Sequence, residues 1–115
     1  MTPADQRRYV RFKTPVTVEL SGAGGFQTCL TDDLGAGGCR VTVVMPLQTG
    51  TAVRVRLRSD RGGQEASGTA TVAWSSRNPP YQVGLAFSTL LVEGMVPFLR
   101  ALIGPARLLT PGHGQ

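Results

Sequence analysis

The sequence predicts a mainly β protein, a six-stranded antiparallel barrel with one short α-helix at its C-terminal end. Short segments of alternating apolar and polar residues recur at regular spacing, with turn-forming residues between them. The 115 residues include 15 glycines and 8 prolines, which favour short strands and turns over long helices. Apolar residues at helical spacing occur near the C-terminus, after the last of these segments.

The expected strands are separated by glycine-rich or proline-containing stretches. The clearest alternation lies in "VRVRLR", where two valines and a leucine share one face and three arginines share the other. In chain order we expect strands at Val16–Leu20, Phe26–Asp32, Gly38–Val44, Val53–Arg58, Glu65–Trp74 and Tyr81–Phe87.

The expected helix covers "VPFLRALIG", from Val96 to Gly104. Proline suits a first helical turn, so Pro97 is expected there, and Gly104 is expected to cap the C-terminus. The chain is thus divided into a basic arm (1–13), a barrel with its helix (14–104) and a flexible tail (105–115).

The charge of the chain predicts an anionic partner. The net charge is +5 and the isoelectric point is about 10.2, which suits a nucleotide, a nucleic acid, an acidic protein face or an anionic membrane surface. Eleven of the twelve basic residues are arginine, whose planar guanidinium binds phosphate through two hydrogen bonds and stacks on flat rings. A genome rich in G and C would also favour arginine codons, so the excess has two explanations.

Other classes of function find little support. Cys29 and Cys39 are too few for a disulfide scaffold and, with His113 in the tail, do not suit a zinc site. We find no nucleophile motif, no phosphate-binding loop ending in Lys-Ser or Lys-Thr, and no carboxylate pair placed for catalysis, which predicts a protein that is not an enzyme. No secretory signal or membrane-spanning run is evident, so the cytoplasm is the expected location.

Two stretches carry candidate binding residues. The first is the arm, where Arg7, Arg8 and Arg11 can converge on one multivalent anion. Taken alone, it also fits a solvated basic tail. The second is "DDLGAGG", a turn whose backbone N–H groups can bind phosphate oxygens and whose Asp33 can accept hydrogen bonds from a guanine edge or an arginine, or cap the turn. Taken alone, it also fits a hairpin with a bulge, in which glycines supply positive φ.

Together the two stretches resemble the PilZ domain, the bacterial receptor for cyclic di-GMP. Its signature is an RxxxR arm followed by a D/N-x-S-x-x-G turn, and the chain has Arg7-x-x-x-Arg11 and then Asp33-x-Gly35-x-x-Gly38. The resemblance extends to "RRYVRFKTPVTVEL", "MPLQTGTAVRVRL" and "TVAWSSRNPPYQVGLAF", and to the final helix. The chain departs from the signature at Gly35, where the family has serine.

The resemblance implies a ligand and a set of roles. Arg7 and Arg11 would hold the phosphates of cyclic di-GMP and stack on guanine, with Arg8 assisting. Asp33 would read a guanine edge, and Gly38 would let the backbone approach the ligand. Arg40 and Trp74 are secondary candidates. The family often binds an intercalated ligand dimer, and folding of the arm over it changes the surface shown to a protein effector, without any cofactor.

Two alternatives stay open. Relatives that have lost the ligand act only as protein-interaction modules, and the missing serine hydroxyl fits that role. The arginines of "VRVRLR", Arg54, Arg56 and Arg58, could instead bind nucleic acid. Sparse aromatic residues and the lack of a recognition helix disfavour this, and a solvent-facing strand, such as an edge blunted by charge, explains the arginines more simply.

Overall fold

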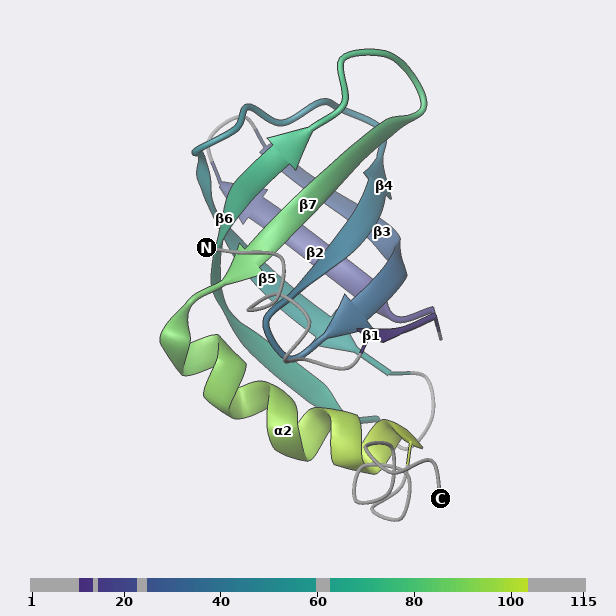
Figure 1. Cartoon of the computed structure of the whole chain (residues 1–115), viewed down its shortest axis with the longest axis vertical. Helices are drawn as coiled ribbons and strands as arrows, with labels where there is room; N and C mark the ends of the chain where they lie inside the picture. Colours follow the sequence, from purple (N-terminus) through teal and green to yellow (C-terminus); the bar gives the residue numbers. More distant parts are fainter. Residues whose placement is uncertain (1–10, 14, 23–24, 60–62, 104–115) are drawn as a thin grey trace.

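The computed structural model describes residues 11–13, 15–22, 25–59 and 63–103. Within them the chain forms seven strands and one helix, and Figure 1 shows their arrangement. The elements are β1 (Arg11–Phe12), β2 (Thr17–Gly22), β3 (Gly25–Gly35), β4 (Gly38–Val43), β5 (Ala52–Arg58), β6 (Glu65–Ser75), β7 (Tyr81–Phe87) and α2 (Thr89–Ile103).

Six of these strands form a closed antiparallel barrel, as the sequence predicts. Their order is β3-β2-β5-β6-β7-β4, and additional pairing of β3 with β4 closes the ring. β1 lies outside the ring and pairs with β3, Arg11 opposite Gly35 and Phe12 opposite Leu34. The predicted arm, residues 1–13, therefore ends in a short strand, and residues 1–10 lie outside the described part of the chain.

The barrel core follows from the alternation along each strand, because every second side chain points inward. On β5 the valines and leucine are buried and the arginines face outward. The same pattern holds on β2, β4 and β7, so one continuous core fills the ring. The fully buried residues include Val18, Leu34, Val41, Leu57, Val72 and Val83.

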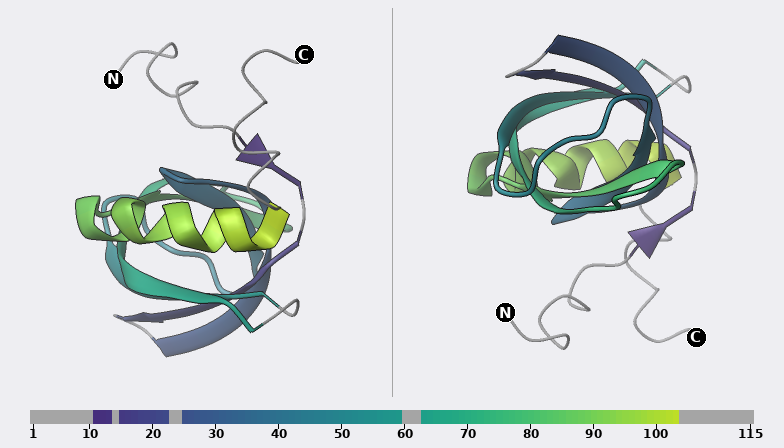
Figure 2. Two further views of the ribbon diagram at one scale, coloured as in Figure 1. Left: turned by 90° about the horizontal axis from the view of Figure 1, so that it is seen from below. Right: turned by 90° about the horizontal axis from the view of Figure 1, so that it is seen from above.

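α2 closes one end of the barrel, where it packs mainly against β6 (Figures 1 and 2). Its buried side consists of apolar residues at helical spacing: Leu91, Met95, Phe98, Leu99 and Leu102. The backbone N–H of Leu91 donates to Ser88 Oγ (3.3 Å), so Ser88 caps the N-terminus of the helix.

The predicted start of this helix was wrong. The helix begins at Thr89 rather than Val96, and Pro97 lies inside it rather than in its first turn. A proline in a helix interior lacks the N–H that would bond to the carbonyl four residues before it. Burial of Leu91 and Met95 against the barrel extends the helix across this interruption. The predicted cap, Gly104, lies outside the described residues.

Candidate functional site

The glycine-rich turn joins β3 to β4, and a β-bulge precedes it. The pairing shifts between Thr31 and Asp33, so Asp32 is the extra residue of β3. The Asp32 carboxylate accepts a hydrogen bond from Thr42 Oγ1 at 2.8 Å. Because the bulge shifts the register by one residue, Asp33 lies directly opposite Arg40 on β4.

Asp33 and Arg40 form an ion pair beside the turn. Arg40 Nη2 lies 3.7 Å from Asp33 Oδ2, and the side chains are 36% and 15% exposed, respectively. Arg40 is therefore an ion-pair partner of Asp33, at a distance too long for a hydrogen bond. Arg40 is partly exposed at the surface, whereas Asp33 is largely covered.

The glycines of the turn have a different role from the one that the hairpin interpretation gave them. Among the described residues, positive φ occurs at Gly22, Gly25, Gly50 and Gly63, and not between Gly35 and Gly38. A Cβ on Gly38 would instead collide with the carbonyl oxygen of Leu85 on β7 and lie 3.3 Å from its carbonyl carbon. Gly38 therefore permits close approach of β7, and Phe87 N–H donates to Gly37 O (2.9 Å) to fasten the turn to the same strand.

The arm reaches this turn through β1. The pairing of Arg11 with Gly35 sets the backbone of the second arginine of the RxxxR motif beside the first glycine of the turn. Arg7 and Arg8 lie outside the described residues, as does the side chain of Arg11. The two stretches that the sequence singled out thus meet on β1 and β3.

Cross-strand pairing continues from the turn to the secondary candidates. Arg40 on β4 pairs with Gly84 on β7, and Gly84 pairs with Trp74 on β6. Together with Asp33, these residues form what we call the Asp33–Trp74 row: Asp33, Arg40, Gly84 and Trp74. At about 4.8 Å between strands, the row spans roughly 14 Å on the outer surface of the barrel.

Trp74 lies over Gly84 in this row. A Cβ on Gly84 would lie 2.7 Å from Trp74 Cδ1, so the missing side chain provides the space that the indole occupies. Trp74 is nevertheless 45% exposed, which leaves part of the ring available to solvent. Sequence reasoning named Trp74 but missed Gly84. The "VGLAF" segment carried no signal for this contact, because the contact depends on the register between β6 and β7.

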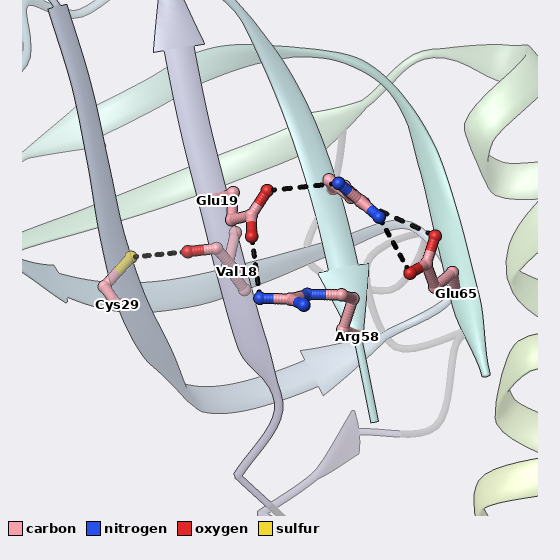
Figure 3. Close-up of polar contacts among 6 residues, drawn as sticks. Val18, Glu19, Cys29, Arg58 and Glu65 are labelled. Atoms are coloured by element: carbon pink, nitrogen blue, oxygen red, sulfur yellow. Dashed lines mark hydrogen bonds and ion pairs between the residues drawn. The ribbon is translucent and has the colours of Figure 1, made fainter. Parts of the chain in front are cut away.

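The arginines of β5 lie on the strand between β2 and β6, and Figure 3 shows the ion pair of Arg58 with Glu19. Glu19 of β2 pairs with Arg58 (2.7 Å) and Arg56 (3.7 Å), and Arg56 also pairs with Glu65 of β6 (2.9 Å). The hydrogen bond from Arg56 lowers the pKa of Glu65. β5 is paired with β2 on one side and with β6 on the other, so the suggestion that it is an edge strand blunted by charge was wrong.

The two cysteines are free thiols in the structure. Cys39 is buried in the barrel core. Cys29 is partly buried, and its Sγ donates to Val18 O at 3.7 Å (Figure 3). Burial, with a smaller contribution from Asp32, raises the pKa of the Cys29 thiol to about 11. Thiolate chemistry at neutral pH is therefore disfavoured at Cys29.

A small cavity opens at the end of the barrel away from α2. It lies between the β2–β3 hairpin and residues 45–47, and it shares no residue with the Asp33–Trp74 row. The side chain of Gln27 fastens this region, because its oxygen accepts from the N–H groups of Val44 (3.1 Å) and Met45 (3.3 Å). The described residues hold no cluster of His, Cys, Asp and Glu suited to a metal ion, and their one helix is too short to cross a membrane.

The described residues therefore form a closed six-stranded antiparallel barrel with a helix after the last strand, and a glycine-rich turn joins β3 to β4. The PilZ domain profile matches residues 5–101, and the chain belongs to the PilZ domain family. No curated protein sequence matches the chain.

Solved structures share the fold at low sequence identity. The PilZ domain with c-di-GMP of YcgR from Escherichia coli is 17% identical with a TM-score of 0.66, over 92% of this chain and 98% of that one. A structure of YcgR from Escherichia coli in complex with c-di-GMP is 18% identical with the same TM-score, over 93% of this chain and 50% of that one. The Bacillus subtilis inhibitor of motility (MotI/DgrA) is 17% identical, again at 0.66, over 86% and 52%. The chain therefore spans about half the length of these two proteins.

Proposed function

We propose that this protein is a cyclic di-GMP receptor that binds its ligand between the arginine arm and the β3–β4 turn. The observation that carries the proposal is the pairing of Arg11 with Gly35, which brings the backbone of the arm to the turn that holds Asp33. Membership of the PilZ family and the c-di-GMP complexes of YcgR, which shares the fold, support the same ligand.

The residues have distinct roles in this proposal. Arg7 and Arg11 bind the phosphates and stack on guanine, with Arg8 as an additional cation. Asp33 accepts hydrogen bonds from a guanine edge, which requires it to exchange its long contact with Arg40 for the base. Arg40 is then released toward a phosphate, so both members of the pair gain a ligand partner.

Trp74 is a secondary contact in the same proposal. Its exposed ring lies in one row with Asp33 and Arg40, and a flat aromatic surface stacks on a base at about 1–3 kcal/mol. An intercalated ligand dimer presents more base surface than a single molecule and would reach farther along this row. Binding then folds the arm over the ligand and changes the surface available to a protein effector.

Gly35 weakens the proposed site. The family serine at this position offers a hydroxyl, and one such hydrogen bond contributes about 1 kcal/mol, or up to about 2. Its absence lowers the expected affinity roughly five- to thirtyfold. The arginines and the backbone N–H groups of the turn remain.

A ligand-free interaction module is the second candidate. The observations that favour it are Gly35 in place of serine and the ion pair that Asp33 already makes with Arg40. Nucleic-acid binding is less favoured, because Arg56 and Arg58 on β5 are paired with glutamates and so have a reduced attraction for phosphate.

Calorimetric titration with cyclic di-GMP tests the proposal. We expect saturable binding by the wild type, its loss in Arg7→Ala/Arg11→Ala and tightening in Gly35→Ser. A stoichiometry of two ligands per chain would identify the intercalated dimer. Arg54→Ala is the matched control, since it removes an exposed arginine on β5 and should bind normally. Cyclic di-AMP tests base selectivity and should bind more weakly.

The same titration separates the candidates. No heat and no NMR shift at high ligand concentration would refute the receptor and leave the interaction module. If Arg54→Ala abolished binding and the arm variant retained it, the site would lie on β5. Nucleic-acid binding would in addition weaken steeply with rising salt.

A further inference from the structure

The outward side of α2 is unusually apolar for a surface helix. Four exposed positions follow one stripe at helical spacing: Leu90, Gly94, Pro97 and Ala101. Leu90 is 80% exposed, and Gly94 has open space where a Cβ would point. The other side of α2 packs into the barrel, so exposed apolar residues lie on the helix in addition to its buried apolar side. A contiguous exposed apolar surface of this kind often marks a site of protein association.

α2 carries two charged residues, and both lie beside this stripe. Glu93 and Arg100 are exposed and seven residues apart, which is about 10 Å along the helix axis. Both are therefore on the outward side, on either side of Val96 and Pro97. Neither forms an ion pair with another described residue.

We propose that this surface pairs two copies of the chain, α2 against α2 in antiparallel orientation about a two-fold axis near Val96 and Pro97. In this arrangement Glu93 of each copy faces Arg100 of the other, so two equivalent ion pairs form. The exposed Leu90 of each copy lies toward the small Ala101 of the other. Such a self-complementary surface is what a two-fold interface requires.

The surface fits a second copy because its opposite charges are placed symmetrically. When a second helix lies antiparallel to the first with the midpoints between Glu93 and Arg100 together, Glu93 of each helix comes opposite Arg100 of the other. Gly94 and Ala101 also permit the close helix approach, about 8 Å between axes, that small contact residues allow. In Figure 2, α2 lies across the barrel end with no described segment over its outward side.

The dimer is expected to be weak. One face of a 15-residue helix buries far less than the roughly 800 Å² per partner of a standard stable interface. Each copy also carries a net charge of +5, which opposes association at low salt. Self-association should therefore depend on concentration and be measured near 0.15 M salt, where charges farther apart than about 8 Å are screened.

Charge reversal tests the pairing by sedimentation equilibrium over a wide protein concentration range, without nucleotide. We expect a monomer–dimer equilibrium for the wild type. Glu93→Arg and Arg100→Glu should each weaken it roughly tenfold, because two attractive pairs become repulsive. An equimolar mixture of the two variants should recover the dimer, since one copy then presents only positive and the other only negative charges. The double variant should also recover it.

Folding controls and an independent variant complete the test. All variants alter exposed positions, so circular dichroism and the melting temperature should match the wild type. Leu90→Ser should weaken the dimer without affecting the barrel core. A wild type that stays monomeric at every concentration would overturn the proposal. A dimer insensitive to both reversals, or reversed variants that do not associate when mixed, would equally overturn it.

Discussion

Replacing Gly38 by alanine should destabilise the barrel in the absence of any ligand. The new Cβ would overlap the carbonyl oxygen of Leu85 and lie 3.3 Å from its carbonyl carbon and 3.5 Å from Ala86 Cα. All three atoms belong to the backbone of β7, so no side chain can rotate away and the two strands must separate. Overpacking of this kind costs about 1–3 kcal/mol. For a domain of this size, that lowers the melting temperature by roughly 5–20 °C.

Thermal and urea unfolding followed by circular dichroism measure this effect. Gly94→Ala is the matched control, because the added methyl meets open space on an exposed helix and should stabilise the protein by about 0.5–1 kcal/mol. A melting temperature of Gly38→Ala within about 2 °C of the wild type, with a normal response of the control, would refute the packing argument. Gly38 would then act only through a ligand, and the variant would lose affinity alone.

Three further predictions concern the remaining contacts. Gly84→Val should displace the ring of Trp74 and shift its fluorescence emission to longer wavelength, and an unchanged spectrum would contradict the packing of the ring over Gly84. The raised pKa of Cys29 implies a contribution to native stability that is fully present below pH 9.0 and is lost as the pH rises toward 11, because the unfolded state loses the thiol proton first. Cys29→Ala should therefore lose less stability over this pH range, measured as the urea midpoint of unfolding, and a loss equal to that of the wild type would contradict the prediction. Glu19→Gln removes the pairing with Arg58 and Arg56 and should cost about 1 kcal/mol or less, with the difference shrinking in 1 M salt; a salt-independent difference would point to packing instead.

The six barrel strands were predictable because their inward residues alternate with outward ones over enough positions to exclude a helix, whereas the two-residue β1 was not. The start of α2 was not. Residues 89–95 include threonine, valine and glycine, which are poor helix formers, and Pro97 imitates a helix start. Burial of Leu91 and Met95 decides the matter, and this depends on the barrel that they cover.

The candidate site was predictable in its residue types but not in its arrangement. The sequence named Asp33, Arg40 and Trp74 separately. Their common row depends on three strand registers, and the first of these is set by a bulge at Asp32; the hairpin interpretation of this stretch included a bulge but did not place it. The glycines of the turn were recognised as special, but the reason, the close approach of β7 at Gly38, comes from a strand that is distant in sequence.

Because β1 lies outside the closed ring, it can detach from β3 without any strand of the ring separating from its neighbours. Two residue pairs join it to β3, and the ring is complete without it. Exchange of the amide hydrogens of the core strands with solvent is therefore expected to need a larger opening of the barrel than exchange at Arg11 and Phe12, which needs only detachment of β1. β1 can therefore leave β3 and pair with it again while the barrel stays folded.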